Sequence, residues 1–284
     1  MLRPKNNKTK PRIKHRPFLK WAGGKFRLMD DLNRVFPKRK RCLIEPFVGA
    51  GAVFLNSHFE RYILADINPD LINLFNIVKD NVDAYIEACK LIFFAENANT
   101  AEYYYAQRDA FNQSTDPFVR SVLFLYLNRF GFNGLCRYNS KNEFNVPFGA
   151  YKTHYFPEDE LRYFAHKAQS AVFLCADFQQ TFELADKHSV IYCDPPYAPL
   201  PQDTNFTGYA GNSFGLEHQK NLAECAKKAQ KEKQISVVIS NHDTKFTREI
   251  YKGAKFKRVK VQRSISQSSE KRVKVKELIA IFKG

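Results

Sequence analysis

The stretch "SVIYCDPPYAPL", residues 189–200, joins an apolar run directly to an acid, two prolines and a tyrosine. Residues 189–193 are mostly β-branched, aromatic or small, which predicts a short buried strand. Two prolines cannot continue a β-ladder, and each restricts the residue before it. Asp194 and Tyr197 are therefore expected at the carboxyl end of a strand, where open α/β sheets bind their ligands. The alternative is that the DPP sequence only ends a strand.

Further strands are predicted on both sides of this one, and they indicate a single sheet. Most of the runs are separated by helical patterns, which favours a parallel sheet of βα units. The last two runs are joined by the polar stretch "SISQSSE", which predicts an antiparallel hairpin at the end of the sheet. The seven runs cover residues 41–45, 62–66, 171–175, 189–193, 235–240, 256–264 and 272–282.

About a hundred residues separate the second run from the third, and they predict an inserted module. Asp116 and Pro117 are typical of an N-cap and a first helical position. The stretch 131–152 is rich in Gly, Asn and aromatic residues, whereas linkers are poor in aromatics, so it predicts a substrate-reading segment. Helices are predicted over residues 69–79, 82–95, 101–112 and 117–130.

The charge of the chain points to a polyanionic partner. The 284 residues carry 45 Lys and Arg against 29 Asp and Glu, a net charge of +16. Such an excess favours nucleic acid first and an anionic membrane second. Residues 1–16 hold seven lysines and arginines and no acid, and we expect a basic tail there.

The composition argues against several other classes of protein. No apolar run is long enough to span a bilayer, and the N-terminus lacks the apolar segment of a signal peptide. The six cysteines include no CxxC pair, which favours reduced thiols and a cytoplasmic location. The seven histidines show no ligand spacing, so no metal is expected.

Two glycine-containing motifs indicate a nucleotide-like ligand. "LIEPFVGAG", 43–51, predicts a strand, a glycine turn and a helix, but Phe54 stands where a nicotinamide site would want a third glycine. Asp66 ends the next strand, where a carboxylate can accept both hydroxyls of a ribose; the alternative is a helix cap. In "FLKWAGGK", 18–25, a glycine turn brings Trp21 and Lys25 to one side. Lys25 can pair with a carboxylate and Trp21 can cover a sulfonium, unless they are simply a buried Trp and a solvated Lys.

The motifs FLKWAGGK, EPFVGAG, LADIN and DPPY occur in this order, and the set resembles the Dam-type DNA adenine-N6 methyltransferases, which modify GATC. The resemblance extends through "LFLYLNRFGFNGLCRYN", "FNVPFG" and "VISNHDT", from about residue 17 to the end. The position of the insert resembles the alpha arrangement of amino-methyltransferases. The resemblance implies an α/β, Rossmann-like methyltransferase domain, residues 17–68 and 158–284, and an inserted, mainly helical DNA-recognition domain with a β-hairpin, residues 69–157.

The same resemblance implies S-adenosylmethionine as cofactor, with no metal. Its expected contacts are Trp21, Lys25, Asp66 and Asp194, and the loop around Asp177 and Phe178 would meet the adenine of the cofactor.

The DPPY sequence then has a chemical purpose. Asp194 and the carbonyl of Pro195 would accept hydrogen bonds from the two N–H groups of an adenine amino group and aim its lone pair at the methyl group of the cofactor. The target atom is inaccessible inside a duplex, so the adenine must be flipped out, and Tyr197 would stack on it.

Reading of the DNA sequence is expected from the insert. Arg137 is the candidate for a bidentate contact to guanine, and its alternative is a solvated surface charge. The resemblance implies that Leu135 and Pro147 approach bases, Asn133 lies near the orphan thymine and Lys20 reads the outer guanine. Phe132 and Tyr151 complete the expected DNA contacts. The basic tail and "KFKRVKVQR" are expected to contact phosphates, or to be solvated faces.

Two positions depart from the family pattern. Members often carry a tyrosine where this chain has Phe132 and a basic residue where it has Ala150. These departures bear on DNA contacts and leave the reaction untouched.

Two rival functions remain open from the sequence. One is a DNA-binding regulator that kept the fold without catalysis, against which the intact DPPY argues. The other is methylation of RNA or of a protein amide. The expected partner is double-stranded DNA containing GATC, with no membrane, and the chain is expected to be a monomer.

Overall fold

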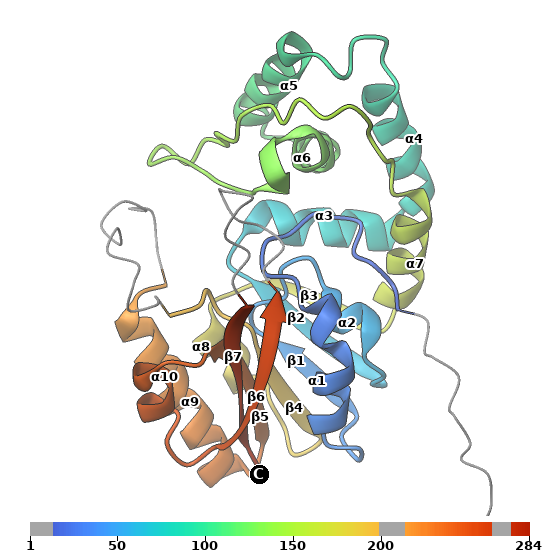
Figure 1. The fold of residues 1–284 in the computed structure, drawn as a ribbon. Coiled ribbons are helices and arrows are strands. Elements are labelled where there is room, and N and C mark those ends of the chain that lie inside the picture. Colours follow the sequence, from blue (N-terminus) through green and yellow to red (C-terminus); the bar gives the residue numbers. More distant parts are fainter. Residues whose placement is uncertain (1–13, 199–213, 263–273) are drawn as a thin grey trace, which may run out of the picture.

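A computed structural model describes residues 14–198, 214–262 and 274–284, and it shows one seven-stranded sheet (Figure 1). The strand order is β3-β2-β1-β4-β5-β7-β6. The first five strands in this order are parallel, and β7 is antiparallel to both β5 and β6. The predicted α/β fold, with a mostly parallel sheet that ends in an antiparallel pair, is therefore confirmed.

The strands begin and end within two residues of their predicted bounds. β1, β4 and β5 are buried along their whole length, because helices cover both faces of the sheet. The hairpin turn predicted at "SISQSSE" lies outside the described residues. The strands are β1 (Cys42–Glu45), β2 (Arg61–Asp66), β3 (Ala171–Cys175), β4 (Ser189–Cys193), β5 (Ser236–His242), β6 (Lys255–Gln262) and β7 (Lys274–Phe282).

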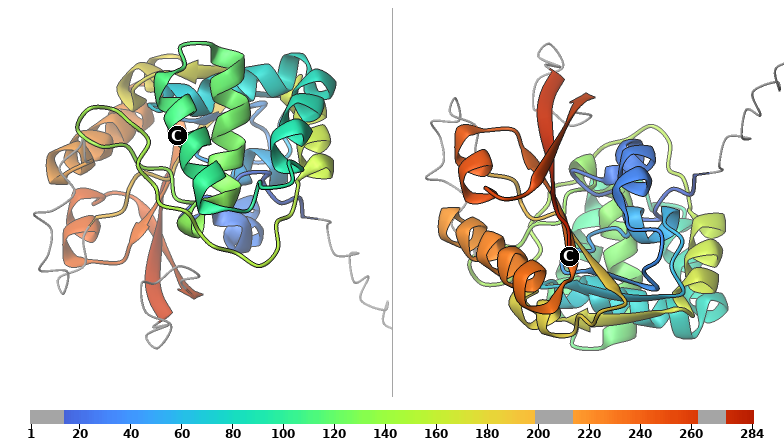
Figure 2. Two further views of the ribbon diagram at one scale, coloured as in Figure 1. Left: turned by 90° about the horizontal axis from the view of Figure 1, so that it is seen from above. Right: turned by 90° about the horizontal axis from the view of Figure 1, so that it is seen from below.

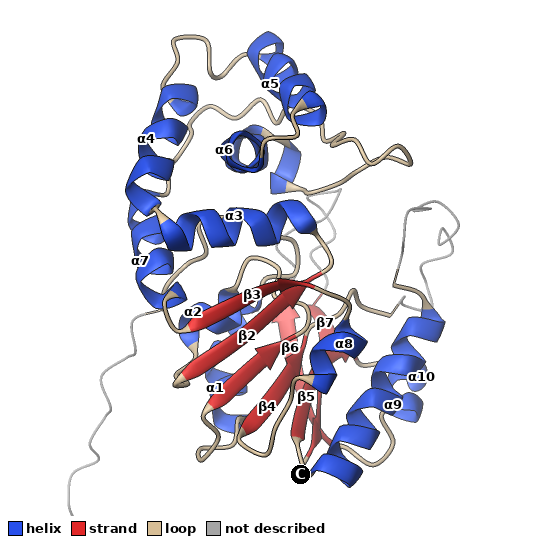
Figure 3. Ribbon diagram, turned by 180° about the vertical axis from the view of Figure 1, so that it is seen from behind, coloured by secondary structure: helices blue, strands red, loops and turns tan. Residues whose placement is uncertain are grey.

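Helices lie on both faces of this sheet. Seen from below, the blue helix α1 (Met29–Val35) and the orange helix α9 (Leu216–Lys233) lie on opposite sides of it (Figure 2). α2 (Ala52–Asn56) is on the side of α1, while α8 (Phe178–Glu183) and α10 (Lys245–Ile250) are on the side of α9 (Figure 3). Alternate strand residues accordingly enter two separate apolar clusters, with Leu43 in one and Ile44 in the other.

A helical layer stands beyond one edge of the sheet. α3 (Pro69–Asp80) lies between the sheet and the helices α4 (Val82–Phe93), α5 (Ala101–Gln113) and α6 (Pro117–Phe130), and α7 (Glu158–Ala168) returns to the sheet (Figure 1). The helix predictions are confirmed, including the Asp116 cap, which accepts from the N–H of Val119. None of the helices among the described residues is both long and apolar enough to cross a membrane.

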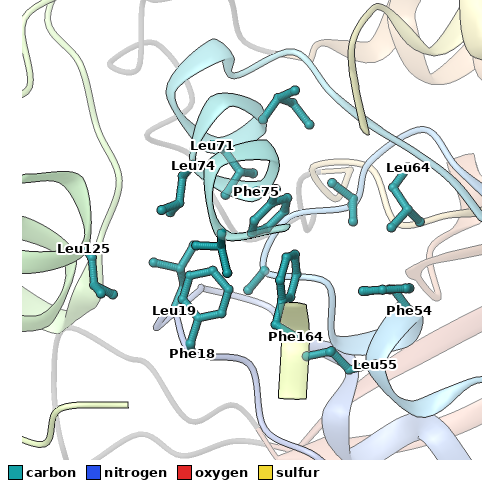
Figure 4. Packing of buried hydrophobic residues seen from close by; sticks show 14 of the residues in the cluster. Phe18, Leu19, Phe54, Leu55, Leu64, Leu71, Leu74, Phe75, Leu125 and Phe164 are labelled. Carbon is teal, nitrogen blue, oxygen red and sulfur yellow. The ribbon is translucent and has the colours of Figure 1, made fainter. Parts of the chain in front are cut away.

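Aromatic and aliphatic side chains join this layer to the sheet. Phe18, Phe75 and Phe164 come from the N-terminal segment, α3 and α7, and their rings lie 4.7–5.9 Å apart, centre to centre (Figure 4). α3 packs against β2 and β3 as well as against α6. Because α3 contacts both the sheet and the helical layer, these contacts do not decide where one domain ends and the other begins. The domain bounds at residues 69 and 158 therefore stay a prediction.

Lys14 and His15, expected in the basic tail, contact α1, α2 and α7. Lys14 pairs with Asp30 at 2.8 Å. The ring of His15 stacks on Tyr163 with 3.5 Å between centroids, and its backbone N–H donates to Asn56. Residues 1–13 of the predicted tail lie outside the described residues.

An ion pair ties α6 to the start of α3. The guanidinium of Arg120 donates from Nε and Nη2 to the two carboxylate oxygens of Asp70, at 2.8 and 2.9 Å. The hydroxyl of Tyr138 donates to the same carboxylate at 2.7 Å. The loop after α6 is thereby anchored to the helix that follows β2.

The β-hairpin predicted in the insert is reduced to two isolated antiparallel bridges, Gly131–Phe148 and Tyr138–Phe144. A short 3-10 turn, η2 (Phe132–Gly134), follows the first bridge, and Asn133 and Asn142 have positive φ angles. Such kinks interrupt a regular ladder. We call residues 131–151 the recognition loop from here on.

Candidate active site

Three carboxylates lie along the same edge of the sheet. Glu45 ends β1, Asp66 ends β2 and Asp194 follows the last residue of β4. Because β2, β1 and β4 are adjacent and parallel, their carboxyl ends lie side by side. This is the edge at which open α/β sheets bind ligands.

Asp194 is paired with Lys25. The ammonium lies 2.9 Å from Oδ1 of Asp194 and donates to the carbonyl of Gly23 at 2.6 Å. The side chain of Lys25 is only 6% exposed, so the reading of a solvated lysine is wrong. Burial raises the pKa of Asp194, and the neighbouring ammonium opposes that rise.

Asp66 holds the glycine turn. Its Oδ2 accepts from the N–H of Gly49 and its Oδ1 from the N–H of Asn68, both at 3.1 Å. The cap of α3 is Asn68, whose side chain accepts from two N–H groups of the first turn. The capping alternative for Asp66 is therefore wrong. Burial raises the pKa of this carboxyl, and the two backbone donors oppose the rise.

Trp21 lies against the same turn. Gly49 has a φ of +48°, and a Cβ at this position would lie 2.9 Å from the indole Nε1. Glycine is therefore needed both for the backbone angle and for the approach of the ring. Half-buried, Trp21 is neither a fully buried core residue nor a free surface group.

Glu45 was not anticipated as a site residue. It is 2% exposed, and its Oε1 has no hydrogen-bond partner among the described residues. Burial raises its pKa well above the ordinary value, and the charge of Asp194 adds to the rise. Its place at the end of the "CLIE" run was the available signal, because an acid that ends a fully buried strand faces the ligand edge.

The turn at residues 194–198, which we call the catalytic turn, is held by its side chains as well as its prolines. The hydroxyl of Tyr197 donates to Glu277 of β7 at 3.0 Å. The Lys25 ammonium lies 4.7 Å from the centre of the Tyr197 ring, and the His242 ring meets it edge-on at 4.8 Å. Pro195 is buried. A turn that only ended a strand would not require these partners.

The loop after β3 has a structural role at Asp177. Its side chain accepts from the N–H of Gln179, and together with Gln180 it forms a capping box at the start of α8. Phe178 is buried and stacks on Phe47 with 5.7 Å between ring centres.

Several of the residues expected to contact DNA lie together. The Lys20 ammonium sits over the ring of Tyr151, 4.3 Å from its centre, and donates to the carbonyl of Arg129 at 2.9 Å. The Tyr151 hydroxyl accepts from the N–H of Asn133 at 2.6 Å. Gly134 packs so closely on Lys20 that a Cβ there would lie 2.2 Å from the Cβ of Lys20. These contacts join "FLKWAGGK" to the recognition loop.

The apolar members of the predicted set lie in the same loop. The N–H of Phe132 donates to the carbonyl of Pro147 at 2.8 Å, and the Phe132 side chain is 45% exposed. Leu135 packs against the core. Ala150 has a φ of +48°, a backbone conformation that residues other than glycine rarely adopt.

Arg137 lies farther along the loop and is exposed. Its Nε donates to the side-chain oxygen of Asn145 at 2.7 Å and its Nη2 to the backbone oxygen of the same residue at 3.0 Å. The guanidinium is thus held by the opposite arm of the loop rather than freely solvated.

The described residues contain no group of three or more His, Cys, Asp or Glu side chains that could hold a metal ion.

Comparison with known proteins decides the family. Residues 21–265 match the family of D12 class N6 adenine-specific DNA methyltransferases. The chain belongs to this family. It is also 82% identical over 282 residues to the DNA adenine methylase of Haemophilus influenzae, with 99% of each chain covered.

Two other relatives agree. The DNA adenine methylases of Escherichia coli and Vibrio cholerae are 59% and 58% identical to it, over 95% of this chain and 96% of theirs. The chain is therefore a DNA adenine methyltransferase, which decides against the rival readings of a non-catalytic regulator and of an RNA or protein methyltransferase.

Proposed function

We propose that this methyltransferase transfers a methyl group from S-adenosylmethionine to N6 of adenine in duplex GATC, after flipping the adenine out of the helix. The observation that carries the proposal is the position of Glu45, Asp66 and the Lys25–Asp194 pair at the carboxyl ends of three adjacent strands. The matching sequence family supports the substrate base, and the net charge of +16 supports a duplex partner.

The residues present fit this cofactor. Asp66 is already oriented by two backbone donors and offers its carboxylate to the ribose hydroxyls. The unpartnered Oε1 of Glu45 can accept a hydrogen bond from a cationic or N–H group of the ligand. Trp21 offers an aromatic face for a positively charged sulfur, beside Gly49, which has no side chain to obstruct the approach.

When bound, the cofactor supplies an electrophilic methyl group, which leaves its sulfur as a C–N bond forms and the C–S bond breaks. Asp194 and the Pro195 carbonyl accept hydrogen bonds from the two N–H groups of the adenine amino group and turn its lone pair toward that methyl group. The nitrogen is left with one proton too many, and the Asp194 carboxylate takes it and releases it to water. The Lys25 ammonium favours the ionised form of Asp194, against the effect of burial.

Recognition of the sequence is assigned to the recognition loop. Arg137 supplies a planar set of donors for O6 and N7 of a guanine. Phe132 exposes a ring that can enter the stack of DNA bases. The other proposed DNA contacts lie where the loop meets the rest of the protein: Lys20, Asn133, Leu135, Pro147 and Tyr151. Tyr197 would stack on the flipped adenine. We place the reaction in the bacterial cytoplasm, with the enzyme as a monomer.

Labelled S-adenosylmethionine and a panel of duplexes test the proposal. The panel contains GATC and its single-base variants, and the methylated base is located by mass spectrometry of nucleosides and of fragments. We expect N6-methyladenine in GATC. Label in another sequence context would overturn the assigned specificity, and label on cytosine or on protein would overturn the reaction.

Cofactor binding is tested separately by calorimetry. Asp66→Ala should weaken binding of S-adenosylmethionine and leave the preferred DNA sequence unchanged, because a ribose contact carries no information about bases. Unchanged affinity would contradict the ribose assignment.

A further inference from the structure

A buried polar network behind the catalytic turn has no part in the reaction as described so far. It consists of Gln219 from α9, Asn241 from β5 and Tyr251, which follows α10. All three side chains are no more than 1% exposed. Burying three polar groups costs free energy unless every one is hydrogen-bonded, so their shared target is informative.

The network reaches the turn through its backbone. The side-chain Nε2 of Gln219 donates to the carbonyl of Pro196 at 2.6 Å. The N–H of Ala198 donates to Oδ1 of Asn241 at 3.0 Å, and the carbonyl of Ala198 lies 2.7 Å from Nδ1 of His242. The peptide groups on either side of Tyr197 are therefore hydrogen-bonded to buried side chains.

The members of the network also fix one another. Nδ2 of Asn241 donates to Oε1 of Gln219 at 2.9 Å and to the hydroxyl of Tyr251 at 3.1 Å. The Tyr251 hydroxyl lies 3.3 Å from the same Oε1 of Gln219. This arrangement determines which end of the Gln219 amide is the donor, so that its NH₂ group faces Pro196.

We infer that Gln219, supported by Asn241 and Tyr251, is a positioning residue that aims the Pro195 carbonyl at the adenine amino group. Asp194 is fixed on one side by Lys25, and the Pro196 carbonyl is fixed on the other by Gln219. Pro195, the one residue between these anchors, and Pro196 itself are prolines, whose rings lock φ. The orientation of the Pro195 carbonyl then has almost no freedom left.

This inference rests on the proposed methyl transfer, and it predicts an effect on chemistry rather than on binding. Gln219→Leu keeps a side chain of similar size and removes both the donor to Pro196 and the acceptor for Asn241. The single-turnover rate of methylation should fall on the order of ten- to hundredfold, because a small misplacement of a reacting group is costly. Affinities for S-adenosylmethionine and for duplex should stay within about twofold of wild type, as for an interaction made in the transition state.

Gln219→Glu tests the role of Gln219 through the pH dependence of the methylation rate, which a purely structural role would leave unchanged. A protonated carboxyl at this position can donate to the Pro196 carbonyl, whereas an ionised one repels it. The ratio of the mutant rate to the wild-type rate should therefore fall as pH rises, while the ratio for Gln219→Leu stays flat. The ionisable groups nearest this site, Asp194, His242, Tyr251 and Glu277, are the same in wild type and in both variants, so the ratio removes their contribution.

Tyr85→Phe is the matched control, because the Tyr85 hydroxyl also donates from a buried position to a carbonyl, that of Ser121, but in the helical layer. It should lower the melting temperature and leave the single-turnover rate unchanged. If Gln219→Leu does not fold, Gln219→Glu alone decides.

A wild-type single-turnover rate in Gln219→Leu, or a flat pH ratio in Gln219→Glu, would overturn the inference. If wild type methylated adenine in a sequence other than GATC, the assigned specificity would fail. The same ratios measured on that sequence would still test the role of Gln219.

Discussion

The catalytic turn and the recognition loop are held in different ways. Backbone groups of the turn bond to buried side chains from β5 and α9, and its acid is paired with a buried lysine. The loop forms isolated bridges in place of a regular ladder, and buried side chains of α5 and α6 donate to the carbonyls of Val146 and Gly134. Its contact between Arg137 and Asn145, by contrast, lies at the surface. A reacting atom needs one fixed position before the substrate arrives. A sequence-reading side chain must exchange an internal partner for a base.

One segment touches both regions. In "FLKWAGGK", Lys20 packs on the recognition loop and Lys25 pairs with the catalytic turn, five residues along the chain. The difference between the two regions therefore predicts that substitutions in the turn reduce methylation of every duplex alike, and that substitutions in the loop change which duplex is preferred.

The largest effect is expected at the turn. Asp194→Ala should reduce methyl transfer by about 10³-fold or more, because it removes an acceptor that orients the amino group and the group that takes its proton. Much of the duplex affinity should remain, since phosphate contacts supply most of it. Rates with labelled cofactor and binding by fluorescence anisotropy check this, with circular dichroism to verify folding. Turnover within severalfold of wild type would remove Asp194 from the reaction.

The next effect concerns specificity. Arg137→Ala should cost about 1–3 kcal/mol on GATC and much less on a duplex already altered at the contacted guanine pair. Lys141→Ala, which removes another cation of the same loop, is the control. The measurement is kcat/KM for GATC and each single-base variant at one salt concentration. An equal loss on all duplexes would make Arg137 a phosphate contact.

A smaller loss is expected from Tyr151→Phe. The change leaves the N–H of Asn133 without its acceptor while the ring under Lys20 remains. We expect kcat/KM on GATC to fall by about 1 kcal/mol, the usual worth of one hydrogen bond. Tyr155→Phe, which removes the hydroxyl that an exposed tyrosine donates to Glu160, should be neutral. Equal effects of the two changes on kcat/KM would argue against a role for the bond between Asn133 and Tyr151 in holding the recognition loop.

The last effect is on stability rather than on activity, and it lies outside both regions. Burial lowers the pKa of Lys167 to about 8, against which the charge of Glu45 acts, while an unfolded lysine titrates at about 10.4. Between these values the unfolded chain binds more protons, so folding becomes more favourable as pH rises. The free energy of unfolding of wild type relative to Lys167→Met should increase from about pH 8 to about pH 10. Urea titrations at several pH values measure it, and a constant difference would contradict the lowered pKa.

The sequence predicted those features whose signal is local. The order of strands and helices, the Asp116 cap and the turn after β4 each depend on a few neighbouring residues. The order of the motifs was enough to place Lys25 and Asp194 in one site, although 169 positions separate them, and the structure pairs them at 2.9 Å.

Contacts that depend on packing between distant elements could not be predicted. Nothing in "LEHQKN" indicates that Gln219 turns toward Pro196 or that Asn241 fixes its amide. Asp66 and Asn68 are equally plausible caps by residue type, and only the backbone geometry decides between them. The position of Glu45 at the end of a buried run could be seen in the sequence, but the lack of a hydrogen-bond partner for its Oε1 could not.

The separation of chemistry from sequence reading is tested most directly by one comparison of specificity ratios. The ratio of kcat/KM for GATC to kcat/KM for the duplex altered at the guanine pair is measured in wild type, Gln219→Leu and Arg137→Ala. We expect Gln219→Leu to be slower on both duplexes with the wild-type ratio, and Arg137→Ala to have a ratio nearer to one. A changed ratio in Gln219→Leu, or an unchanged ratio in Arg137→Ala, would contradict the account.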